Sequence, residues 1–306
     1  MASKRRPSST DTSQAASSAE PTWRVMHADA RDAVAELRDG SVDCVVTSPP
    51  YWRQRDYGYD GQLGNEADPN AYVARLVELF AEIRRVLNTT GTVWLNVGDK
   101  YHNGRLMGMP WRVALALQDE GWWLRADVIW HKPNAMPSSV KNRPTVDHEY
   151  LFLLTRGEQY YYDADAIREP HVTFSEASRM KGCRKHFGVR GGTPEIGKNS
   201  GNVNMHDARW DQAFHPAGRN RRTVWSIPLS KNRDAHFAVF PQRLVEICLR
   251  AGCPAGGTVL DPFMGTGTTG RVALGMGLGF IGIDRSEEYC DIARRHLQAA
   301  SDAAKS

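Results

Sequence analysis

A glycine-rich turn near the carboxyl end of the chain places the strongest constraint on its fold. Residues Thr258–Leu260 read as a short strand, and Gly265, Gly267 and Gly270 follow it with the spacing GxGxxG. That spacing lets the backbone approach a ligand closely where a helix begins. Only residues 271–306 remain after the turn, which is enough for a helix, a strand and one further helix. Earlier segments must therefore supply the other strands, and this predicts a circularly permuted sheet.

An acidic residue after the next strand indicates what the turn would bind. The predicted strand Gly279–Ile283 is followed by Asp284, where a carboxylate is well placed to accept hydrogen bonds from ribose hydroxyls. The turn and the acid together favour a cofactor that contains a nucleoside. The alternative is purely structural: a tight strand-to-helix turn, with Asp284 as the cap of a helix over Ser286–Leu297.

The rest of the chain alternates short apolar runs with amphipathic stretches, a pattern typical of α/β proteins with a parallel sheet. Helices are predicted over Tyr72–Leu87, by apolar periodicity, and over Gln242–Arg250, after a proline. Strands are predicted over seven segments: Trp23–His27, Val42–Thr47, Thr92–Val97, Ala126–Trp130, Tyr150–Thr155, Thr258–Leu260 and Gly279–Ile283.

The composition, with 41% hydrophobic and 24% charged residues in 306, predicts a globular protein with a sizeable core. No apolar run reaches the length of a membrane span and none follows the basic amino terminus, so the expected location is cytoplasmic, away from membranes. The five cysteines are scattered, which argues against a disulfide scaffold or a structural zinc site. A metal shared by Cys183 and His186 is the remaining alternative, and we expect none.

Two segments lack the periodicity of the core. Residues 1–21 are rich in Ser, Ala and Thr, and we predict a disordered tail there because it cannot offset its ordering entropy. Residues 163–222 are rich in Gly, Asn, Arg and His, and the part from His171 to Arg222 holds ten Lys or Arg against four Asp or Glu. This predicts a loop-rich binding insertion, the alternative being a flexible solvated loop.

A second motif lies at the end of an early strand. The strand Val42–Thr47 stops at Ser48-Pro49-Pro50-Tyr51. The prolines lack backbone donors and hold the chain extended, so the carbonyl groups of Ser48 and Pro49 stay free to face a ligand. Tyr51 then presents a ring, unless it is only a core aromatic.

The two motifs together resemble the DNA methyltransferases that methylate exocyclic amino groups. The motif of that family is (Asp/Asn/Ser)-Pro-Pro-(Tyr/Phe/Trp), and here it precedes the glycine turn Asp261–Thr269. This order resembles the permuted subgroup labelled beta. Other segments that resemble the subgroup are His27–Ala30, His148–Thr155, Thr223–Ile227 and His236–Pro241.

The resemblance implies a Rossmann-like, circularly permuted methyltransferase sheet. Residues 22–162 would form its catalytic half, 163–222 the target-recognition insertion and 223–306 the half that binds S-adenosylmethionine. The first segment contains Asp29, which would hydrogen-bond the adenine amino group of the cofactor. The residues expected to contact the cofactor are Asp29, Ala30, Phe240, Asp261, Pro262, Phe263, Gly265, Thr266, Gly267, Thr268, Thr269 and Asp284.

Catalysis is expected from Ser48, Pro49, Pro50 and Tyr51. A sulfonium methyl group is already activated, so no enzyme nucleophile is needed, and the site must align the amine and accept hydrogen bonds from it. The Ser48 hydroxyl and the Pro49 carbonyl suit that task. Tyr51 would stack on a base rotated out of the duplex.

Double-stranded DNA is the expected partner, and the expected DNA contacts in the insertion are Arg184, Arg190 and Arg221. The presence of a cognate restriction endonuclease acting on the same site, and the choice between monomer and homodimer, stay open.

Ser48 favours cytosine N4 as the target, because Asp or Asn more often accompanies adenine in the family. Adenine N6 is the near alternative, whereas methylation at cytosine C5 needs a cysteine nucleophile that does not adjoin the motif. A nicotinamide-dependent oxidoreductase would leave the Ser48–Tyr51 motif unexplained. A catalytically silent DNA-binding adaptor would predict a damaged glycine turn, whereas Asp261, Gly265, Gly267 and Asp284 are all present.

Overall fold

The computed structural model describes residues 22–170, 215, 217–229 and 241–305. The predicted disordered tail (1–21), most of the predicted insertion (171–214) and Phe240 lie outside the described residues. Among the described helices, none combines the length and the apolarity that a bilayer crossing requires.

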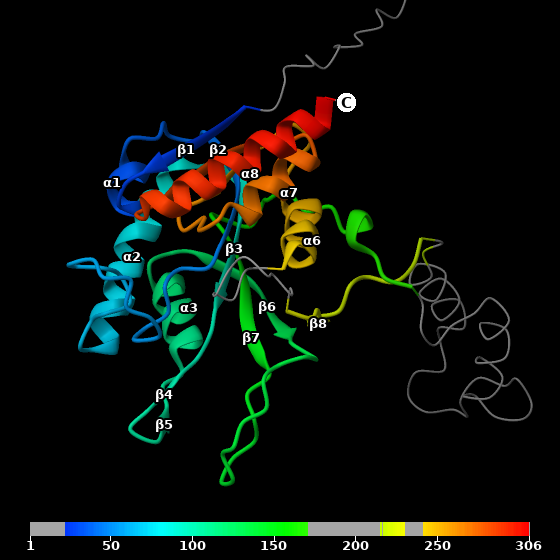
Figure 1. The fold of residues 1–306 in the computed structure, drawn as a ribbon. Helices are drawn as coiled ribbons and strands as arrows, with labels where there is room; N and C mark the ends of the chain where they lie inside the picture. Colours follow the sequence, from blue (N-terminus) through cyan, green and yellow to red (C-terminus); the bar gives the residue numbers. More distant parts are fainter. Residues whose placement is uncertain (1–21, 171–214, 216, 230–240, 306) are drawn as a thin grey trace, which may run out of the picture.

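An eight-stranded sheet forms the centre of the molecule, with helices on both faces (Figure 1). This confirms the predicted α/β class. The strand order is β1-β10-β9-β2-β3-β7-β6-β8, and β4 and β5 form a separate hairpin. The strands are β1 (Trp23–His27), β2 (Val42–Thr47), β3 (Leu87–Val97), β4 (Tyr101–His102), β5 (Arg105–Leu106), β6 (Trp123–His131), β7 (His148–Thr155), β8 (Val224–Ser226), β9 (Thr258–Asp261) and β10 (Gly279–Asp284).

Earlier strands complete the sheet around the glycine turn, as its late position in the chain predicts. β9 leads into the turn and pairs in parallel with β2 on one side and β10 on the other. β10 in turn pairs in parallel with β1, with His27 opposite Asp284. Segments from both ends of the chain therefore meet at the carboxyl edge of these parallel strands.

The prediction of a parallel sheet is wrong for one strand. β7 runs antiparallel to both of its neighbours, β3 and β6, and the other described pairs in this sheet are parallel. A parallel neighbour needs a crossover connection, usually a helix. Residues 132–147 join β6 to β7 without a helix, so β7 returns beside β6 in the opposite direction and the sheet is mixed.

The helices form two layers that bury opposite faces of the sheet. One apolar cluster contains residues of α1 (Ala30–Ala35), α2 (Pro69–Val86) and α3 (Met109–Asp119). The other contains residues of α6 (Gln242–Gly252), α7 (Thr268–Gly275), α8 (Glu287–Lys305) and the short 3-10 helix η1 (Asp165–Ile167). Successive side chains of a strand point to opposite faces, so β2 contributes Val45 to the first cluster and Cys44 and Val46 to the second.

Some elements begin earlier than predicted, or were not predicted. α2 begins at Pro69, before Tyr72, because the Asp68 carboxylate caps it and accepts the Asn70 N–H at 3.1 Å. α3 has no side-chain cap, and its N-cap is Gly108 in a left-handed conformation. β8 has only three residues. Three residues are too few to show a strand pattern. α3 does carry a helix pattern that the sequence analysis missed, because Pro110 lies in its first turn and Met109, Val113 and Leu117 are buried at helical spacing.

The third glycine of the turn is required by packing. A Cβ at Gly270, on α7, would lie 2.5 Å from the ring of Phe280 on β10 and 2.6 Å from the side chain of Leu297 on α8. Both neighbours are buried. The bare Cα of Gly270 therefore lets α7 approach the sheet and α8 closely.

We expect Gly270→Ala to destabilise the fold, because the added methyl group must displace two buried side chains. The free energy of unfolding should fall by roughly 1–3 kcal/mol, measured by urea denaturation. Gly275→Ala in the same helix is the control, since nothing lies within 4 Å of its added Cβ and alanine favours helix. Unchanged stability of the Gly270 variant would contradict the close packing.

Candidate active site

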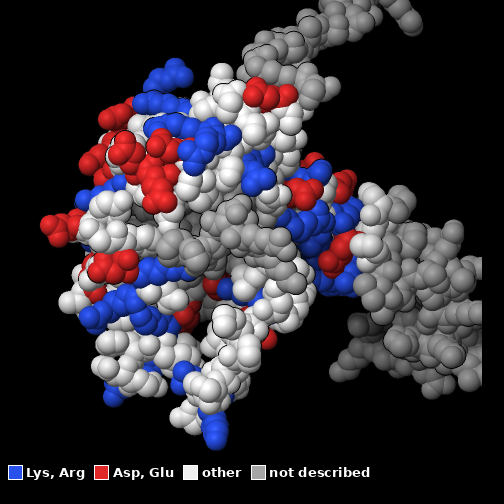
Figure 2. Space-filling view, viewed as in Figure 1, with Lys and Arg blue, Asp and Glu red and all other residues white. Residues whose placement is uncertain are grey.

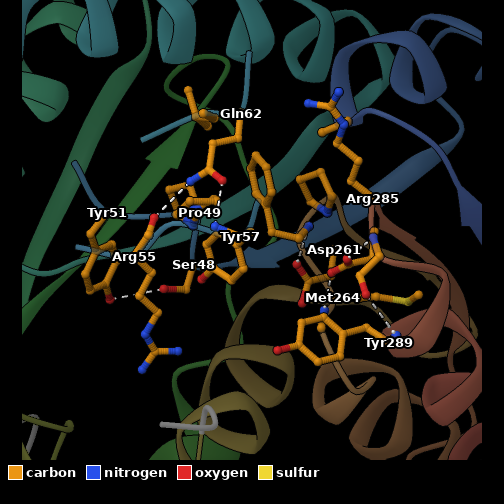
Figure 3. Close-up of a pocket in the computed structure, with 18 of the residues that line it drawn as sticks. Ser48, Pro49, Tyr51, Arg55, Tyr57, Gln62, Asp261, Met264, Arg285 and Tyr289 are labelled. Atoms are coloured by element: carbon orange, nitrogen blue, oxygen red, sulfur yellow. Dashed lines mark hydrogen bonds between the residues drawn. The ribbon is translucent and has the colours of Figure 1, made fainter. Parts of the chain in front are cut away.

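A cavity of about 460 Å³ opens at the carboxyl edge of the parallel strands, within the range of roughly 300–1,000 Å³ typical of ligand pockets. Figure 3 shows Ser48 and Tyr51 on one side of it and Asp261, Met264 and Tyr289 on the other. The cavity therefore brings together the two motifs that lie far apart in the sequence.

The predicted catalytic residues all line this cavity: Ser48, Pro49, Pro50 and Tyr51. Most residues predicted to contact a cofactor also line it: Asp29, Ala30, Asp261, Pro262, Phe263, Gly265, Thr266, Thr268, Thr269 and Asp284. Gly267 is not among the described residues that line the cavity. It packs against α8, where an added Cβ would lie 3.1 Å from Ala293.

The Asp284 carboxylate holds the glycine turn against the end of β10. It accepts the Gly265 N–H at 2.9 Å through one oxygen and the Ser286 N–H at 2.8 Å through the other. Asp284 also lines the cavity. The structural alternative, Asp284 as the helix cap, is wrong, because α8 begins at Glu287 and the Ser286 hydroxyl accepts the Tyr289 N–H at 3.3 Å. Gly265 adopts a left-handed φ of 52°, and nothing lies within 4 Å of a Cβ placed there, so the turn presents bare backbone.

Asp261 joins the glycine turn to the strand that precedes the Ser48–Tyr51 motif. Its side chain is buried and accepts hydrogen bonds from the hydroxyls of Thr47 at 2.8 Å and Thr269 at 2.6 Å, and from the Phe263 N–H at 3.1 Å. Burial raises the pKa of Asp261 to about 6, although these donors act to lower it. The carboxylate thus connects β2, the turn and α7.

A hydrogen-bonded path leads from Ser48 to a carboxylate on β7. The Ser48 hydroxyl donates to the Tyr51 hydroxyl at 3.1 Å, which donates to Glu149 Oε2 at 2.7 Å. Asn96 Nδ2 donates to the Tyr51 hydroxyl at 2.6 Å and to Glu149 Oε2 at 2.7 Å. Lys132 forms an ion pair with Glu149 Oε1. The path gives the neutral Ser48 an indirect connection to a negative charge.

Sequence reasoning missed Asn96, Lys132 and Glu149 as site residues. A polar residue within the apolar run Thr92–Val97 could have singled out Asn96. Glu149 lies in the segment His148–Thr155 that carries the family resemblance, but its contact with Tyr51 depends on how β3 and β7 pair.

The Tyr51 ring packs at the end of β3. A Cβ at Gly98 would lie 2.6 Å from the ring, so the glycine makes room for it. Burial, and then the charge of Glu149, raise the pKa of Tyr51 well above its usual value. The hydroxyl therefore stays protonated. The stacking of the Tyr51 ring on a base is a separate point and stays a prediction.

The loop after the Ser48–Tyr51 motif contacts the cofactor-turn side of the cavity. The Arg285 guanidinium donates to the Asp60 carbonyl at 3.1 Å and lies 5.4 Å from the centroid of the Tyr59 ring. Within the loop, the Gln62 side chain accepts the Tyr57 N–H at 2.7 Å (Figure 3). These contacts tie the two sides of the cavity together.

Of the three predicted DNA contacts, only Arg221 lies among the described residues. Its Nε donates to the Ile167 carbonyl at 3.0 Å, and its guanidinium lies 5.6 Å from the centroid of the Trp225 ring. Desolvation lowers the pKa of Arg221. Arg184 and Arg190 lie outside the described residues.

We expect the contribution of Asp261 to stability to fall as the pH rises. Its pKa goes from about 3.8 when unfolded to about 6 when folded, so the folded state binds the extra proton between these values and is favoured at the lower pH. Compared with Asp261→Asn, the unsubstituted chain should lose up to about 3 kcal/mol of unfolding free energy between about pH 4 and pH 7. Urea denaturation measures the unfolding free energy of both proteins across this range. The value for the unsubstituted chain minus the value for Asp261→Asn should fall as the pH rises, and an increase would contradict the prediction.

Comparison with known proteins places this site in a family. A family model described as DNA methylase, for N6 and N4 methyltransferases, matches residues 42–295. Type II methyltransferase M.SmaI of Serratia marcescens is 39% identical to the chain over 303 residues and covers 90% of both sequences. Type II methyltransferase M.Cfr9I of Citrobacter freundii is 40% identical, covering 88% of this chain and 86% of its own.

Solved structures share the fold. The PvuII DNA methyltransferase (cytosine-N4-specific) superimposes with a TM-score of 0.66 at 18% identity and covers 94% of both chains. TTHA0409 of Thermus thermophilus, in complex with S-adenosyl-L-methionine, gives a TM-score of 0.58 at 23% identity over 92% of this chain and 95% of its own. With its two motifs meeting at one cavity, the chain belongs to the DNA methylase family and is a DNA amino-methyltransferase.

Proposed function

We propose that this enzyme transfers a methyl group from S-adenosylmethionine to the N4 amine of a cytosine that is rotated out of double-stranded DNA. The observation that carries the proposal is the hydrogen-bonded path from Ser48 through Tyr51 to Glu149. It connects a neutral serine to a carboxylate that can take up the proton the methylated amine loses. Cytosine is favoured by Ser48 in place of an acid or amide, and PvuII, which shares the fold, is named as cytosine-N4-specific.

The cavity fits S-adenosylmethionine through the chain's own groups. The bare backbone at Gly265 leaves room for close approach, Asp284 keeps lone pairs that would accept ribose hydroxyls, and Asp29 lines the wall where an adenine amine would donate. When bound, the cofactor supplies a methyl group on a positively charged sulfur. The relative TTHA0409 was solved with this molecule.

Ser48 serves as a hydrogen-bond acceptor for the target amine. Its hydroxyl hydrogen is donated to Tyr51, and its oxygen accepts one hydrogen bond from Asn96 Nδ2 at 3.4 Å. The remaining lone pair of that oxygen is left for an amine N–H. The free carbonyl of Pro49, which also lines the cavity, accepts the second N–H. Two acceptors draw the amine lone pair out of conjugation with the base and orient it for transfer.

The same path removes the proton that the product must lose. As the new N–C bond forms, the S–C bond of the methyl donor would break and its electron pair would stay on the sulfur, which becomes neutral. The amine is then cationic and passes a proton to Ser48 Oγ. The Ser48 hydroxyl proton moves to Tyr51, and the Tyr51 proton moves to the Glu149 carboxylate, as the donor directions allow. Lys132 stabilises that carboxylate before the transfer.

We further propose that residues 163–222 form the target-recognition region between two halves of the methyltransferase domain, 22–162 and 223–306. A basic, loop-rich segment supplies side chains that reach base edges from a surface separate from the sheet. Arg184, Arg190 and Arg221 are its candidate DNA contacts.

Analysis of the product tests the proposed target base. DNA incubated with the enzyme and labelled S-adenosylmethionine, then digested to nucleosides, should contain labelled N4-methylcytosine by mass spectrometry. Heat-inactivated enzyme is the control. Labelled N6-methyladenine alone would overturn the cytosine assignment and leave the family assignment intact.

Tyr51→Phe tests the proton path, because it keeps the ring and removes the hydroxyl that joins Ser48 to Glu149. We expect kcat to fall by roughly 10²-fold, a typical contribution of acid–base groups, with cofactor affinity unchanged in calorimetry. Glu149→Gln should give a similar loss. Tyr162→Phe removes the hydroxyl of a tyrosine that does not line the cavity and is the control. Normal kcat in Tyr51→Phe would exclude the path without affecting the product assignment.

A further inference from the structure

Two projections leave the sheet beside the cavity. One is the β4–β5 hairpin, within residues 100–108, which follows β3 and Gly98. The other is the connection from β6 to β7, whose residues 133–146 lie between Lys132 and the β7 residue Glu149. Figure 1 shows both extending away from the helical layers. Lys132 and Glu149 line the cavity, so the second projection begins and ends at the active site.

The two projections contact each other. The Arg143 guanidinium lies 3.6 Å from the centroid of the Tyr101 ring, a cation–π contact that joins the β6–β7 connection to the hairpin. We call residues 100–108 and 133–146 together the paired projections. Their mutual contact makes them one surface.

The charge of the paired projections is entirely positive. Neither segment contains Asp or Glu, and their Lys and Arg residues are Lys100, Arg105, Lys141 and Arg143. Among the described residues, Arg105, Lys141 and Arg143 have no ion-pair partner. Figure 2 shows basic atoms at the tip of the long projection without acidic atoms beside them.

The paired projections also expose apolar side chains on a stiff backbone. Met136 is 84% exposed and Leu106 is 54% exposed. Pro133, Pro137 and Pro144 restrict the backbone of the longer projection, and a restricted segment loses less conformational entropy when it binds. Cationic groups interspersed with exposed apolar ones suit the phosphates and sugars of a nucleic acid.

We propose that the paired projections grip the sugar–phosphate backbone of DNA beside the active site. Arg105, Lys141 and Arg143 contact phosphates next to the target base, and Met136 and Leu106 pack on sugars. A base that leaves the duplex must enter the cavity from which the longer projection extends, so the flanking backbone passes along this surface. This grip rests on the enzyme acting on DNA, whichever base it methylates.

The test is the salt dependence of DNA binding by the double variant Lys141→Ala/Arg143→Ala. Removing one phosphate contact should reduce the slope of log K against log salt by about 0.9, so the double variant should show a reduction of roughly 2. Because phosphates carry no sequence information, binding should weaken by the same factor for a random duplex and for one carrying the methylated site. Unchanged cofactor affinity in calorimetry shows that the variant is folded.

The control is the double variant Arg38→Ala/Arg295→Ala, which removes the same charge from two exposed residues that have no ion-pair partner among those described. We expect it to keep the original slope. If both double variants lowered the salt slope equally, the change would reflect net charge alone, and the proposal would be overturned. An unchanged slope in the Lys141/Arg143 variant would also overturn it. So would a loss of affinity for the duplex that carries the target sequence with no loss for the random duplex. None of these results depends on the product analysis.

Discussion

The active site depends on one buried carboxylate. Asp261 ends β9 and accepts hydrogen bonds from Thr47, which is 214 residues away at the end of β2, and from Thr269 on α7. Those three positions belong to the catalytic strand, the glycine turn and the helix that follows it. Because a buried acceptor must keep its donors, the contact holds the Ser48–Tyr51 motif and the cofactor turn at one edge of the sheet.

The reversal of β7 completes the site from the other direction. In an antiparallel strand the amino end lies at the edge where the parallel strands have their carboxyl ends. This brings Glu149, near the start of β7, to Asn96 on β3 and to Tyr51. The same reversal makes the β6–β7 connection leave the sheet at the active-site edge, so one topological feature positions both the carboxylate of the proton path and the longer basic projection.

Two of the carboxylates that line the cavity, Asp284 and Glu149, have separate roles. Asp284 accepts hydrogen bonds from the backbone N–H groups of Gly265 and Ser286 and so holds the glycine turn in place. Glu149 accepts a hydrogen bond from the Tyr51 hydroxyl through one oxygen and forms an ion pair with Lys132 through the other. The target amine would lie between them, where methyl donor and proton acceptor approach it from different sides. In the proposed reaction, this separation would let a neutral serine occupy the position nearest the amine.

Local patterns in the chain are enough to predict the α/β class, most strands and both motifs, because glycines, prolines and apolar runs impose local geometry through residue type. The sequence also implied that late strands must join early ones around the glycine turn. The direction of β7, the packing roles of Gly267 and Gly270, and the contacts that join Tyr51, Asn96, Glu149 and Lys132 become visible only in the folded chain. Those features arise from strand order and from side chains that touch across different elements, and no local pattern in the chain specifies either.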